Sequence, residues 1–74
     1  MSNGRALKEL AEAVGAKVVV IKYDGEPEYN LLDKDGERLC IEFTISGMVE
    51  AIGAYYGGHI NYKEAIKQFE LEVL

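Results

Sequence analysis

Two glycine-containing turn sequences interrupt the middle of this 74-residue chain, and they constrain its fold more than any other feature. The segment 17–23 is rich in valine, isoleucine and tyrosine, which favour β-strands, and Asp24-Gly25 follows it directly. Asp-Gly is a strong signal for a two-residue hairpin turn. A second turn sequence, Asp33-Lys34-Asp35-Gly36, separates a strand expected at 28–32 from an alternating strand expected at 37–43. The sequence therefore predicts a three-stranded antiparallel meander.

Helical spacing of apolar residues lies on both sides of this meander. In 5–14, leucine, alanine and valine recur at i, i+3, i+4 and i+7, which predicts an amphipathic helix. A second helix, capped by Thr44 or Ser46, is expected after the third strand. The helical period resumes over 61–73. Residues 69–73 also alternate as a fourth strand would, and we favour the helix.

Together these elements predict a single α+β domain over 1–74, with one helix, a three-stranded meander and two further helices. An apolar sheet face must be covered, so we expect the helices to pack on one face of the sheet. Alternation assigns to that covered face the residues Val19, Ile21, Tyr23, Tyr29, Leu31, Leu39, Ile41 and Phe43. The alternate residues, Val18 and Val20 among them, form a mixed face that we expect to be open to water or to a partner.

The overall composition excludes several function classes. The chain has 13 acidic and 8 basic residues and a formal net charge of -5, so it lacks the broad basic face with which proteins bind nucleic acid. Its apolar runs are too short to span a bilayer, and its first residues lack an apolar signal region. Cys40 is the only cysteine, which excludes an internal disulfide. We therefore expect a cytoplasmic protein that binds neither nucleic acid directly nor a membrane.

The residue types that carry most catalysis do not form a motif here. His59 is the only histidine, and no second histidine or cysteine lies near it to complete a zinc site. Cys40 lies in a predicted strand, away from the helix terminus that would activate a thiol. No Gly-Lys-Ser/Thr sequence follows the glycines, so a phosphate-binding loop is not indicated. We expect no metal, no cofactor and no enzyme activity.

The negative charge is concentrated in the meander. Residues 24–42 hold seven acidic and two basic side chains, whereas residues 1–23 hold two acidic and four basic ones. Six of the acids alternate along the chain in two rows, one at each turn: Asp24, Glu26 and Glu28, and Asp33, Asp35 and Glu37. Alternate residues of an extended chain lie about 6.5 Å apart, a spacing similar to that of phosphates along a nucleic-acid strand. We expect the rows to dock on a basic protein surface that normally receives nucleic acid; the alternative is that they only keep the domain soluble.

Tyrosine is the most frequent aromatic residue, with five copies against two phenylalanines. Tyrosine is enriched at interfaces because it offers apolar area and a hydrogen bond together. Tyr55 and Tyr56 are adjacent on one predicted helix and cannot both face the core fully. We expect one of them to contact a partner.

The size, the order of elements over 7–14, 17–43 and 46–73, and the acidic turns together resemble those of some small phage anti-CRISPR proteins. The resemblance implies a non-catalytic inhibitor that binds a CRISPR effector, often where DNA would sit, with the two acidic rows imitating phosphates. The alternative is a small structural or oligomeric module, such as a phage accessory or antitoxin-like subunit. That module would use the open sheet face or Tyr55 and Tyr56 as its interface, and a homodimer would fit it.

Overall fold

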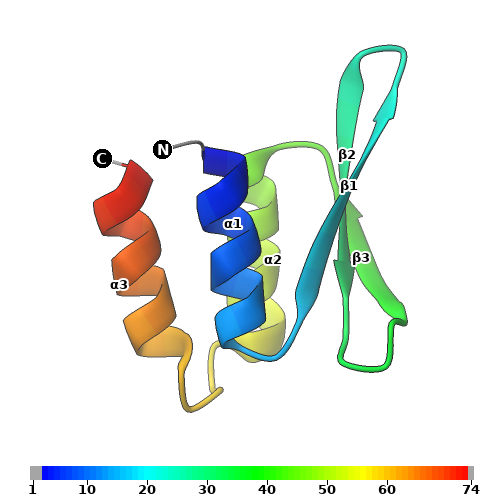
Figure 1. The fold of residues 1–74 in the computed structure, drawn as a ribbon. Coiled ribbons are helices and arrows are strands. Elements are labelled where there is room, and N and C mark those ends of the chain that lie inside the picture. Colours follow the sequence, from blue (N-terminus) through cyan, green and yellow to red (C-terminus); the bar gives the residue numbers. More distant parts are fainter. Residues whose placement is uncertain (1–2, 74) are drawn as a thin grey trace.

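The computed structural model describes residues 3–73, and its elements follow the predicted order (Figure 1). They are α1 (Asn3–Ala13), β1 (Lys17–Tyr23), β2 (Glu26–Leu32), β3 (Arg38–Glu42), α2 (Ile45–Tyr56) and α3 (Tyr62–Val73). The prediction of a helix rather than a strand at the end of the chain is confirmed as far as Val73, and Leu74 lies outside the described residues.

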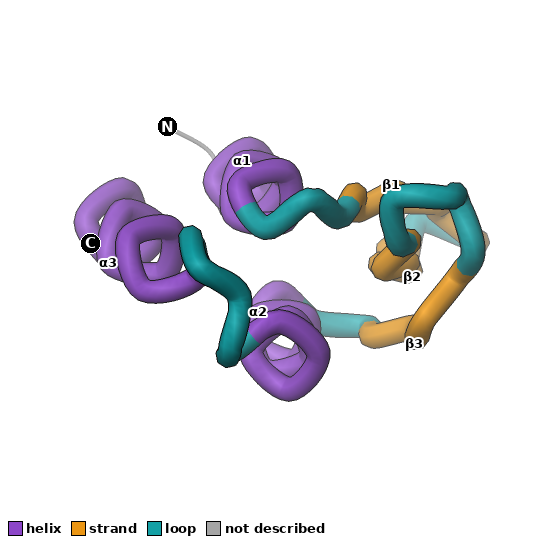
Figure 2. The backbone as a smooth tube through the Cα atoms, turned by 90° about the horizontal axis from the view of Figure 1, so that it is seen from below, coloured by secondary structure: helices purple, strands orange, loops and turns teal. Residues whose placement is uncertain are grey.

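The helices lie on one side of the antiparallel sheet, whose strand order is β1-β2-β3. α1 contacts β1, and α2 contacts β2 and β3, so these two helices cover the sheet. α3 packs against α1 on the side remote from the sheet (Figure 2). The core lies between the sheet and the two covering helices, and its most fully buried side chains are Leu7, Leu10, Val14, Leu31, Met48 and Ile52.

The register of β1 and β2 corrects the predicted assignment of sheet faces. Val18 pairs with Leu31 and Val20 pairs with Tyr29, and directly paired residues share a face of the sheet. Val18 is 3% exposed on the helix side, whereas Ile21 and Tyr23 are 40% and 60% exposed on the other side. The predicted covered face was therefore right for the β2 residues and wrong for Val19, Ile21 and Tyr23.

The same correction applies to most of β3. Leu31 pairs with Cys40 and Asn30 pairs with Ile41, so Cys40 faces the helices and Ile41 faces away from them. Phe43, also predicted to be covered, is 68% exposed. Leu39 lies at a register irregularity and packs against the core, as predicted. We call the uncovered side of the sheet the outer face. The pairing places on it Lys17, Val19, Ile21, Tyr23, Glu26, Glu28, Asn30, Leu32, Arg38 and Ile41.

Two local features determine where α2 begins and how closely α3 packs against it. Thr44 has an extended backbone, and its Oγ1 accepts a hydrogen bond of 3.0 Å from the N–H of Gly47, which confirms one of the two predicted caps. At Gly53, an added Cβ would lie 2.8 Å from the Tyr62 hydroxyl oxygen, so the absence of a side chain lets Tyr62 of α3 approach α2. Among residues 3–73, no helix is both long enough and apolar enough to cross a membrane.

Candidate functional site

The β1–β2 hairpin extends beyond the helices and ends in a tight turn (Figure 1). Asp24 and Gly25 have φ values of 51° and 83°, and positive φ at both central residues defines the type I′ turn. Tyr23 pairs with Glu26 directly across the turn. The predicted Asp-Gly hairpin is therefore present, and it carries the first acidic row away from the helical layer.

The first acidic row is Asp24, Glu26 and Glu28, and its two glutamates lie on the outer face. Glu26 pairs with Tyr23 and Glu28 pairs with Ile21, which places carboxylates beside exposed apolar side chains. Glu28 is half-buried, and its Oε1 accepts a hydrogen bond of 3.3 Å from Nδ2 of Asn30. This part of the outer face therefore combines negative charge with uncovered apolar area.

Asn30 lies under these residues at the centre of the sheet and is only 3% exposed. Its Nδ2 also lies 3.3 Å from the Glu28 carbonyl oxygen and 3.5 Å from that of Val19. A buried amide of this kind must be satisfied by hydrogen bonds, and here the hairpin itself supplies them. The carboxylate of Glu28 is thereby joined to Asn30 by a hydrogen bond.

The second acidic row is Asp33, Asp35 and Glu37, at the opposite end of the meander (Figure 1). Oδ1 of Asp33 accepts hydrogen bonds from the backbone N–H groups of Asp35 at 2.9 Å and Glu37 at 3.0 Å. The N–H of Asp33 also donates to the carbonyl oxygen of Glu37 at 2.8 Å. Asp33 is thus occupied in building its own turn, while Asp35 and Glu37 are exposed. The structure does not bring the two rows together.

Tyr55 and Tyr56 face different surroundings. Tyr56 packs partly against the core, and its ring meets that of His59 edge to face at a centroid distance of 6.4 Å. Burial, with a smaller contribution from the negative charge of Asp33, raises the pKa of Tyr56. Tyr55 is 53% exposed, yet its hydroxyl donates to the carbonyl oxygen of Leu39 at 3.1 Å. Tyr55 is therefore the one of the two that a partner could reach.

Cys40 and His59 lie in different local environments. Burial, together with the negative charge of Glu42, raises the pKa of the Cys40 thiol, which is the opposite of the shift that activates a nucleophile. His59 accepts a hydrogen bond from the N–H of Asn61 through Nδ1 at 3.2 Å, just before α3. Within residues 3–73, no three His, Cys, Asp or Glu side chains gather as a metal site would require.

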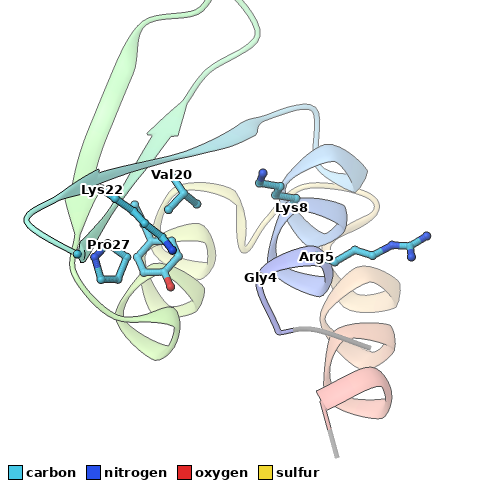
Figure 3. A pocket seen from close by; sticks show the side chains of 8 residues that line it. Gly4, Arg5, Lys8, Val20, Lys22 and Pro27 are labelled. Atoms are coloured by element: carbon cyan, nitrogen blue, oxygen red, sulfur yellow. The ribbon is translucent and has the colours of Figure 1, made fainter.

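A cationic cavity lies between α1 and the β1–β2 hairpin, and no sequence motif predicted it (Figure 3). It has a volume of about 560 Å³, and its lining contains three basic side chains and no acidic one: Gly4, Arg5, Lys8, Val20, Lys22, Gly25, Pro27 and Tyr29. The only sequence signal for it was the excess of basic residues in 1–23.

Comparison of the chain with models of protein families, with curated proteins and with solved structures found no match.

Proposed function

We propose that this chain is a non-catalytic protein-binding domain, and that the outer face of its β1–β2 hairpin docks on a basic surface of a partner protein. The observation that carries the proposal is the exposure of Ile21 and Tyr23, at 40% and 60%, beside Glu26 and Glu28. Apolar and aromatic area supplies most of the binding free energy at an interface, and charge complementarity supplies specificity and association rate.

The two acidic rows are not equal candidates for this contact. Glu26 and Glu28 share a face with exposed apolar side chains, so a partner that meets them also buries apolar area. The second row lies at the other end of the meander, and the Asp33 carboxylate already accepts two backbone hydrogen bonds. We therefore assign the contact to the first row, with Asp35 and Glu37 adding only to the long-range field.

In its specific form, the proposal is that the partner is a nucleic-acid-binding protein and that this chain inhibits it, as anti-CRISPR proteins inhibit CRISPR effectors. The support is the net charge of -5 and the spacing of Glu26 and Glu28 on one extended strand. Alternate residues of a strand lie about 6.5 Å apart and present their carboxylates on the same side. A surface that binds successive phosphates could receive that arrangement.

The test uses a panel of purified CRISPR effector complexes, one of each type, with DNA binding measured in the presence and absence of this protein. We expect one effector to lose DNA binding, and Glu26→Lys with Glu28→Lys to weaken that inhibition by about tenfold or more at low salt. A matched control, Glu12→Lys with Glu70→Lys, changes the net charge equally at exposed helix positions and should alter inhibition less than about twofold. Inhibition of no effector would overturn the anti-CRISPR form, and equal losses in both double variants would overturn the assignment to the outer face.

The alternative function, an oligomeric accessory module, is supported by the same uncovered apolar face. A twofold dimer through this face would bring Glu26 and Glu28 of both copies into one interface, where like charges oppose association. Light scattering across a range of salt concentrations separates the two functions. A monomer favours the basic partner, whereas a tight dimer that the Glu26→Lys and Glu28→Lys changes alter would favour the module.

A further inference from the structure

The free edge of β1 runs beside the cationic cavity, which lies on the helix side of the sheet. β1 is the first strand in the order β1-β2-β3, so only one of its sides is paired. The unpaired side of an edge strand presents N–H and C=O groups to any extended chain that approaches it. Apart from its pairing with β2, β1 makes no backbone–backbone hydrogen bond to any other described residue.

The cavity adds side chains of one charge to that edge. Lys8 of α1 extends toward the strand, and Lys22 of β1 stands on the helix side of the sheet, because it pairs with Pro27 on the face that carries Val20 and Tyr29 (Figure 3). Neither lysine makes an ion pair within residues 3–73. In a chain of net charge -5, the cavity therefore has two lysines on opposite walls and no acid in its lining.

The remaining basic residue plays a smaller part. Arg5 extends away from the strand, and its Nε lies 3.5 Å from Oε1 of Glu9 on the same helix (Figure 3). The floor of the cavity is apolar and aromatic, with Val20, Pro27 and Tyr29. A ligand that fits these walls has carboxylates for Lys8 and Lys22 and aliphatic stems for the floor.

We propose that this edge and cavity bind an extended acidic peptide segment of a partner protein, which adds to the sheet beside β1 as a fourth strand. The backbone of the peptide would pair with the free edge of β1. Its acidic side chains would enter the cavity between α1 and the hairpin. β1 has seven residues and is about 23 Å long, which matches a peptide of similar length. Strand addition takes affinity from backbone pairing and specificity from alternate side chains, and both are available here.

Alternation also defines the other side of the added strand. Residues of the peptide that do not face the cavity would continue the outer face next to Val19 and Ile21, so apolar residues suit those positions. The ligand is therefore a segment in which acidic and apolar residues alternate. It differs in chemistry from the basic surface proposed for the outer face, so either proposal can fail while the other stands.

The probe is a fluorescent heptapeptide that alternates valine and glutamate, with binding measured by anisotropy at low salt. We expect it to bind about tenfold more tightly than the same peptide with glutamine in place of glutamate. Methylation of alternate backbone nitrogens of the peptide should abolish binding, because those groups could no longer donate to β1. Amide hydrogen exchange of Lys17–Tyr23 should slow when the peptide binds.

The matched protein variants are Lys8→Glu with Lys22→Glu, and Lys63→Glu with Lys67→Glu as the control. All four lysines are exposed, and both pairs change the net charge equally. We expect the first pair to weaken binding by about tenfold and the second by less than about twofold. Lys8→Gln with Lys22→Gln, whose folding is checked by circular dichroism, should give an intermediate loss of peptide affinity. This pair replaces the glutamate pair in the test if the glutamate pair does not fold.

Three outcomes would overturn the proposal. Equal binding of the glutamate and glutamine peptides would remove the role of charge. Full binding by the methylated peptide, with succinate competing for it, would indicate a site for small anions rather than strand addition. A dimer in which the β1 amides are already protected without peptide would show that a second copy of this chain occupies the edge.

Discussion

The helix side and the outer face of the sheet both carry valine, but helices cover only the helix side. β1 contributes Val18 and Val20 to the first and Val19 and Ile21 to the second, so valine is present on both. On the helix side α1 and α2 cover them, and Val18 is 3% exposed. On the outer face Ile21 and Tyr23 are 40% and 60% exposed, and their partners across the strand pair are Glu28 and Glu26.

The difference shows that apolar composition alone does not decide which face forms the core. Coverage follows from the pairing register, and the register follows from the loop length at Asp24-Gly25. The outer face keeps its apolar residues although no helix covers them. Uncovered apolar area rimmed by charge is typical of a surface that meets another protein.

The largest contrast between the faces should come from truncating one buried and one exposed aliphatic residue. Leu31 is fully buried on the helix side, so Leu31→Ala should lower the free energy of unfolding by about 2–5 kcal/mol. Ile21→Ala on the outer face should lower it by less than about 1 kcal/mol. Urea unfolding followed by circular dichroism measures both, and equal losses would mean that both faces are buried in solution.

A sharper version uses neighbouring residues of the same strand. Val18→Thr places a hydroxyl at a position that is 3% exposed and should cost about 1–2 kcal/mol. Val19→Thr, at a half-buried position on the outer face, should cost less than about 0.5 kcal/mol. A reversed order of the two losses would indicate a register shifted by one residue, which exchanges the faces.

A third comparison uses two tyrosine hydroxyls. The Tyr55 hydroxyl joins α2 to the backbone of Leu39, so Tyr55→Phe should lower the free energy of unfolding by about 0.5–1 kcal/mol. Tyr23 makes no hydroxyl hydrogen bond within residues 3–73. Tyr23→Phe should therefore leave stability unchanged. Thermal unfolding of both variants measures the two effects, and a loss of stability in Tyr23→Phe instead of Tyr55→Phe would contradict the structure.

The smallest effect should be a loss of stability at alkaline pH. Burial raises the pKa of both Cys40 and Tyr56 above their usual values near 9 and 10. The unfolded chain then releases protons that the folded chain retains, so the stability present below pH 9 declines as pH rises through these values. Cys40→Ala with Tyr56→Phe should flatten the dependence between pH 8 and 11. An equally steep decline in that variant would assign the effect to other groups.

The elements and turns of the fold were predictable because their signals are local. The Asp24-Gly25 turn, the Thr44 cap and the apolar period of 61–73 each depend on residues close in sequence. The turn predicted at Asp33-Lys34-Asp35-Gly36 is present, and the φ of Gly36 is 86°. The covered face was predicted correctly for Tyr29 and Leu31 of β2 but not for β1. The reason is that β1 is apolar on both sides, so alternation alone does not show which of its residues share a face with Leu31. A two-residue loop pairs Tyr23 with Glu26, so residues of opposite parity share a face, and that rule would have placed Val18 with Leu31.

The candidate sites were predictable only in part. The first acidic row was found, but its association with exposed Ile21 and Tyr23 depends on the register. The cationic cavity was missed because Lys8 and Lys22 belong to different elements, and only the packing of α1 against β1 brings them to opposite walls. Charge summed over a segment reports an excess without saying which side chains face one another.

The packing of α3 against α1 has a consequence for how the domain forms during synthesis. The sheet and its two covering helices can form once the chain has emerged from the ribosome as far as Tyr56, because β1, β2 and β3 each pair with a neighbour in sequence. The side of α1 that faces α3 remains uncovered until α3 leaves the ribosome. A nascent chain that has emerged only as far as the residues before Tyr62 would therefore expose the side of α1 that packs against α3. That surface can take part in aggregation until α3 packs against it.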